Sequence, residues 1–237
     1  MTDPMVLERW PRQRAGTARS SSWWGRAFVR SFEETVVDAA DLAKARSMAR
    51  SGRLGAVMVL AGMASAVVDP GRDGAVMPQV KVTRLDDPSW AGFEAELARE
   101  AGHVAALESA ELPAELVEHA DEAGVEVLPG PADFETACDC KAWVQPCPHA
   151  LALLYQLAWR IDADPYVLLL LRGRTREQLL DAEPLDTLDV DDSAGRAACI
   201  LALAEDAPAG HGLADSRVAA YDESVASLVD PAPGSSP

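Results

Sequence analysis

Four potential metal ligands lie close together in the string CDCKAWVQPCPH at 138–149. The pattern is Cys-x-Cys, six further residues and Cys-x-His, and its ligands are Cys138, Cys140, Cys147 and His149. Residues two apart in an extended segment point to the same side, so the first two sulfurs can meet at one point. Three thiolates and one imidazole complete a tetrahedral shell with no open position, which predicts a structural zinc site. Soft sulfur donors favour Zn²⁺ over Mg²⁺ or Ca²⁺.

A strongly apolar segment begins directly after this cluster. Nearly every residue from Pro148 to Ile161 is apolar, which predicts a helix buried on most of its sides. Pro148 suits the first helical position, so Cys147 is expected at the N-cap and His149 in the first turn. The free N–H groups of that helix end favour a thiolate at Cys147. The metal site and the buried helix are therefore expected to start at the same place.

The rest of the pattern predicts an α+β fold, in which helices pack on a small antiparallel sheet. Hydrophobic periodicity predicts helices at 23–37, 41–51, 88–110, 113–123 and 148–161, one more after Pro165, and a short one at 174–182. Strands are expected at 54–60, 63–68, 79–85 and 125–128, with Ala61-Gly62 as the turn of a hairpin. We expect the helix at 88–110 to cover the sheet.

Charge divides the chain into regions. The net charge of the 237 residues is −17, but residues 1–53 carry +4 and residues 183–237 carry −9. We predict a basic flexible arm at 1–20, an α+β region at 21–124, the zinc finger with its following helices at 125–182, and a largely disordered acidic tail at 183–237. A chain this acidic repels a polyanion, so only the N-terminal arginines could contact nucleic acid.

Neither a membrane nor an enzymatic role is indicated by the sequence. The longest apolar run, Val167 to Leu171, is far shorter than the roughly 20 residues of a membrane span. The N-terminus has no apolar region typical of a secretory signal, so we predict a cytoplasmic protein. Phosphate-binding glycine loops, Gly-x-Ser-x-Gly and His-Glu-x-x-His are absent from the sequence, and we nominate no catalytic residue.

Several other side chains have two possible roles. The aromatic residues that open the first predicted helix could stack on bases beside Arg19 and Arg26, although a place in the core is favoured; they are Trp23, Trp24 and Phe28. The arginines after the second apolar helix could bind phosphate or an acidic partner, or could cap a helix C-terminus; they are Arg172, Arg174 and Arg176. His103 and His119 are expected at the surface or at helix ends and not as metal ligands, and Cys199 as a buried or idle thiol.

The ligand spacing and the apolar helix that follows it resemble the SWIM-type zinc finger. In that family the first two cysteines lie on a β-hairpin and the Cys-x-His pair opens the next helix. Trp143 matches an aromatic residue often found in bacterial members, and the resemblance to stand-alone bacterial SWIM proteins extends over roughly 20–182. This chain departs from the usual pattern at Pro148, where many members have a basic residue, and Asp139 lowers the local charge further.

The resemblance implies zinc binding and an interaction with protein or DNA, often near Swi/Snf-type helicases, and it does not imply an enzyme. We therefore predict a non-catalytic interaction module with a protein partner, such as a helicase or remodelling ATPase. Direct nucleic-acid binding is the first alternative. An enzyme that uses zinc only as a structural element is the second.

Overall fold

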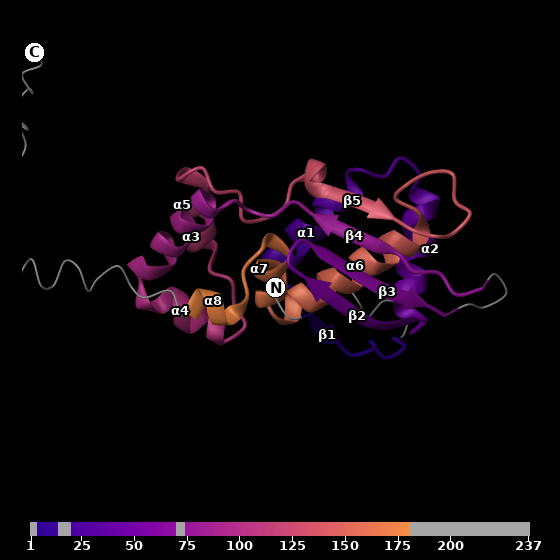
Figure 1. Cartoon of the computed structure of the whole chain (residues 1–237), viewed down its shortest axis with the longest axis horizontal. Helices are drawn as coiled ribbons and strands as arrows, with labels where there is room; N and C mark the ends of the chain where they lie inside the picture. The colour runs from indigo at the N-terminus through magenta and orange to yellow at the C-terminus, as the bar shows by residue number, and fades with distance from the viewer. Residues whose placement is uncertain (1–3, 14–19, 70–73, 181–237) are drawn as a thin grey trace, which may run out of the picture. The chain divides into compact units, whose positions relative to one another are not determined.

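A five-stranded antiparallel sheet lies at the centre of the fold (Figure 1). The computed structural model describes residues 4–13, 20–69 and 74–180. Neighbouring strands pair in the order β1-β2-β3-β4-β5, and every pair is antiparallel. The strands are β1 (Met5–Leu7), β2 (Leu54–Leu60), β3 (Met63–Val68), β4 (Gln79–Val82) and β5 (Phe134–Ala137). The predicted α+β fold is thus confirmed.

The β2–β3 hairpin has the predicted bounds, and its turn is Ala61-Gly62. Gly62 has a positive φ of 79°, a conformation that favours glycine. A Cβ at this position would lie 2.8 Å from the side chain of Arg84, so the close packing also excludes a larger residue. The Gly62 N–H donates to the carbonyl of Leu171, which connects the turn to a helix far along the chain.

Two helices lie against the sheet, and neither is the one that we predicted from the sequence. The apolar helix α6 (Pro148–Ala163) contacts β3 and β4, and α7 (Tyr166–Arg172) contacts β2. In Figure 1, α6 runs behind the strands. On its other side α6 packs against α1 (Trp23–Glu33) and α2 (Ala39–Arg50), which accounts for its burial on most sides. The prediction of an almost fully buried helix after the cysteines is confirmed.

The predicted helix at 88–110 is two helices. The backbone is extended at Glu100, and this residue separates α3 (Asp87–Arg99) from α4 (Ala101–Glu108). The apolar face of α3 packs chiefly on α4 and on α5 (Ala114–Glu122), so the predicted cover of the sheet is wrong. A short helix, α8 (Arg176–Leu180), follows α7.

Two strands were not predicted, and one predicted strand does not form. β1 lies within the predicted arm and pairs with β2 through Met5 and Val59. β5 pairs with β4 and follows the 3-10 turn η1 (Pro131–Asp133). The segment 125–128 is irregular, although Val125 and Val127 are buried. The predicted acidic tail at 183–237, with Cys199, lies outside the described residues.

Asp162, near the end of α6, holds the start of α1. Its carboxylate accepts hydrogen bonds from the backbone N–H groups of Ser21 and Ser22 at 3.0 and 2.7 Å, and from both serine hydroxyls. Gly25 is needed beside it, because a Cβ there would lie 2.7 Å from the Asp162 carboxylate. Burial raises the pKa of Asp162, but the hydrogen bonds lower it more, and the net shift is downward. This contact joins two distant helices of the core.

Candidate metal centre

Strand β5 and helix α6 place the four predicted ligands. The β4–β5 register ends at Ala137, so Cys138 is the first residue after the sheet. Phe134 anchors this strand by edge-to-face contacts with Phe28 and Phe32, at centroid distances of 5.5 and 6.4 Å. At the other end of the segment, Cys147 is the N-cap of α6, as the sequence predicts.

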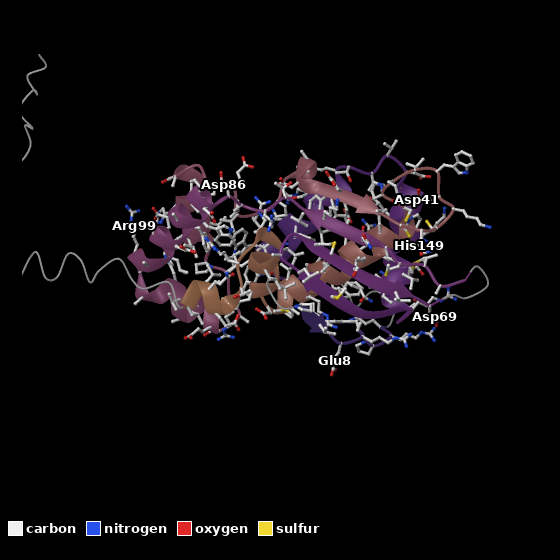
Figure 2. The ribbon with its side chains drawn as sticks, in the orientation of Figure 1. Glu8, Asp41, Asp69, Asp86, Arg99 and His149 are labelled. Atoms are coloured by element: carbon white, nitrogen blue, oxygen red, sulfur yellow. The ribbon has the colours of Figure 1, made fainter. Side chains whose placement is uncertain are left out.

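The structure brings all four predicted ligands together. One donor atom from each of the four side chains lies within 4.8 Å of the others, and Cys147 Sγ lies 4.0 Å from His149 Nδ1. Figure 2 shows His149 beside a group of sulfur atoms. Cys147 is buried, and the other three are half-buried. The cluster of Cys138, Cys140, Cys147 and His149 can therefore hold a metal ion.

Hydrogen bonds from the loop support the ligands. The carboxylate of Asp139 accepts from the backbone N–H of Met77 at 2.8 Å, which links the loop to the segment after β3. The side-chain oxygen of Gln145 accepts from the backbone N–H of Cys147 at 3.1 Å. Cys140 lies in an irregular loop and not on a strand, and these two hydrogen bonds involve residues on either side of it.

Burial makes the thiols of Cys138 and Cys147 hard to ionise without a cation. It is the main cause that raises the pKa of Cys138 to about 12; the backbone N–H of Cys140 lowers this pKa, and the neighbouring thiols raise it. Burial also raises the pKa of Cys147, although the N–H groups of Ala150 and His149 lower it. The helix end thus favours the thiolate as predicted, but burial outweighs it. A bound dication reverses this preference, since a coordinating thiol is deprotonated outright.

The four donor atoms suit a metal ion with tetrahedral coordination and no open position. Bonds of about 2.3 Å to sulfur and 2.0–2.1 Å to nitrogen require donor separations of about 3.5–3.8 Å. The cluster, with donor atoms within 4.8 Å, reaches this geometry by small side-chain movements. Four protein donors leave no position for a substrate or water, which is the arrangement of a structural site.

The loop between the second and third ligands carries exposed apolar side chains. Trp143 is fully exposed (101%) and Val144 is 71% exposed. Most large apolar residues of the described segments are buried, and single exposed ones are common. An exposed tryptophan in the loop of a candidate metal site is a candidate contact for a partner protein. Tryptophan is enriched among the residues that dominate binding energy in protein interfaces.

Several other candidates from the sequence serve the fold, whereas Arg19 lies outside the described residues. Trp24 and Phe28 are buried, and the indole N–H of Trp24 donates to the carbonyl of Ile161 at 2.9 Å. The guanidinium of Arg172 is buried and donates to the carbonyls of Thr83 and Glu126. The other two arginines of that group lie over aromatic rings, Arg174 over Trp90 and Arg176 over Tyr166.

His103 matches only part of its prediction. It lies at a helix end, in the first turn of α4, but it is buried and not at the surface. The sequence gives no sign of this, because the neighbours that bury it come from other helices. His119 lies in the last turn of α5, as expected.

Comparisons with known proteins give one relative. The chain is 32% identical over 164 residues to the uncharacterized protein Rv2102 of Mycobacterium tuberculosis, a match that covers 69% of this chain and 59% of that protein. The chain therefore spans less than two thirds of the relative's length. No protein-family model and no solved structure matches. None of the helices in the described residues is long and apolar enough to cross a membrane.

Proposed function

We propose that this chain is a zinc-binding interaction module of the SWIM type, in which one structural Zn²⁺ is held by Cys138, Cys140, Cys147 and His149. The observation that carries the proposal is the convergence of three sulfurs and one imidazole nitrogen within 4.8 Å. This donor set is one of the common structural zinc sets, and softness favours zinc over the hard cations. Bound zinc would connect the end of β5 to the start of α6.

The partner we propose is a protein. The ligands fix both ends of the loop that exposes Trp143 and Val144, so the loop presents a preorganised apolar tip. Preorganisation lowers the entropy cost of binding. A basic protein surface complements a chain of net charge −17. The family resemblance supports a Swi/Snf-type helicase as the class of partner. We propose a cytoplasmic location for the complex.

Direct nucleic-acid binding is less well supported. Arg9 in the basic N-terminal segment donates to the carbonyl of Gly52 at 2.8 Å, and Arg26 donates to the carbonyl of Ser21. Two of the arginines that could neutralise phosphates thus have partners within the chain. An enzymatic role is also less well supported. A zinc ion with four protein ligands has no free position for a substrate, which supports a non-catalytic role.

The test compares the loop tip with an equally exposed apolar side chain. Trp143→Ala and Val37→Ala are each introduced into the tagged full-length chain in its native host; Val37 is fully exposed (103%) outside the metal loop. Captured proteins are identified by mass spectrometry, and zinc is measured in every sample. We expect Trp143→Ala to keep its zinc and melting temperature but to lose a protein that both the wild type and Val37→Ala retain. Equal capture by the two variants, or a folded wild type without zinc, contradicts the proposal.

A further inference from the structure

We infer a second metal site, formed by Glu100, His103 and Glu115, that binds one divalent first-row transition ion through oxygen and nitrogen donors. Glu100 is the N-cap of α4, His103 lies in the first turn of α4, and Glu115 lies in the first turn of α5. One donor atom from each side chain lies within 4.8 Å of the others. The site is separate from the cysteine cluster and independent of the proposed function.

The hydrogen bonds of His103 leave one ring nitrogen directed at the carboxylates. His103 is only 4% exposed. Its Nδ1 lies 3.3 Å from the backbone carbonyl of Glu96, and because a carbonyl can only accept, Nδ1 carries the proton. Among the described residues Nε2 has no hydrogen-bond partner. A histidine that donates one ring N–H to a carbonyl and offers the other nitrogen is typical of metal ligands.

A cation would stabilise the two carboxylates that lie beside Nε2. Glu100 Oε2 lies 3.7 Å from Nε2, within ion-pair range but too far for a hydrogen bond. Nε2 has no hydrogen-bond partner among the described residues and lies beside the carboxylates of Glu100 and Glu115, whose oxygens are acceptors. The two carboxylates also repel each other. One dication between the three groups satisfies the nitrogen lone pair and balances both negative charges.

The ligand types define the class of ion. Imidazole suits Zn²⁺, Fe²⁺ and Ni²⁺, while carboxylates also suit Mn²⁺. Bonds of about 2.0–2.2 Å require tetrahedral donor separations of about 3.3–3.6 Å. Glu100 and Glu115 are exposed and can close this gap by side-chain rotation. Three protein donors leave the remaining positions to water, so this site is open where the cysteine site is closed.

Mn²⁺ is the appropriate probe, because it prefers oxygen donors and binds thiolates more weakly than Zn²⁺ does. Full-length protein is first treated with a mild chelator, which removes ions from open sites but leaves zinc at the cysteine cluster. It is then titrated with Mn²⁺, and the loss of the free-ion EPR signal gives the affinity. Glu115→Gln is compared with Glu118→Gln, an exposed residue of the same helix whose change alters the net charge equally. We expect Glu115→Gln and Glu100→Gln to raise the Kd roughly tenfold or more, with Glu118→Gln unchanged.

A second readout locates the ion. Bound Mn²⁺ should broaden the ring resonances of His103 in NMR spectra of the wild type at substoichiometric metal, and this broadening should disappear in Glu115→Gln. The inference is overturned if Glu115→Gln and Glu118→Gln bind alike, if the wild type binds no Mn²⁺, or if broadening occurs only in the acidic tail.

Discussion

Replacing Asp162 by Asn tests whether one half-buried carboxylate holds the start of α1 on α6. Asn keeps one acceptor oxygen but turns an NH₂ group toward N–H and O–H donors of Ser21 and Ser22. Hydrogen bonds to a charged group contribute about 1.5–3 kcal/mol each, and partial solvent exposure reduces this. We expect a loss of about 2 kcal/mol in the free energy of unfolding. At about 2–4 °C per kcal/mol, Tm falls by about 4–8 °C.

The pH dependence of this loss has a defined sign. The folded-state pKa of Asp162 is lowered, so its contribution is fully present above the unfolded value of about 3.9. The contribution is lost as the pH falls through the folded pKa. The difference in Tm between the wild type and Asp162→Asn should therefore be equal at pH 7 and pH 5 and should shrink below about pH 4.

Thermal unfolding followed by circular dichroism provides the assay, with Glu122→Gln as the control. Glu122 is exposed at the end of α5, and such surface changes are usually within about 0.5 kcal/mol. Acid would also release a bound metal ion, but from both proteins, so the difference between them still reports on Asp162. An equal Tm for the two proteins at pH 7, or a difference that grows as the pH falls, would refute the reasoning.

Two further predictions concern the metal site and the tail. Cys147→Ser should lose its zinc and lower Tm by about 6–12 °C, equivalent to about 3 kcal/mol, because the zinc that Cys147 binds would hold the start of α6 in place. Cys199→Ser should keep its zinc, and metal loss there would mean a wrong ligand assignment. A chain ending at Ala182 should keep its zinc and its Tm. The acidic residues that follow have too little apolar surface to offset the entropy cost of ordering them. A clear drop in Tm would show that these residues stabilise the core.

The parts of the fold that local sequence determines could be predicted. The four ligands are recognisable because they lie within one short segment next to an apolar helix. The β2–β3 hairpin was placed correctly because a two-residue turn with Gly62 separates two runs of β-branched and apolar residues. The N-cap position of Cys147 follows from Pro148, which fits only the first turn of a helix.

The missed parts depend on residues far apart in the chain. Strand β1 has only three residues and is stabilised by pairing with β2, about fifty residues later. β5 likewise forms by pairing with β4, and the helices α3, α4 and α5 separate the two strands in the chain. The Glu100, His103 and Glu115 cluster was missed for the same reason, since Glu115 comes from a separate helix and the spacing matches no metal motif. Glu100 is three residues before His103, at the N-cap of the same helix, but only tertiary packing brings Glu115 to them.

Zinc X-ray absorption on the purified full-length protein tests the central claim most directly. The sample is first treated with a mild chelator, which removes ions from open sites, and its zinc content is measured. The account predicts one zinc per chain, with three sulfur neighbours at about 2.3 Å and one nitrogen neighbour at about 2.0–2.1 Å. A folded protein without zinc, or a zinc ion surrounded mainly by oxygen and nitrogen, would contradict it.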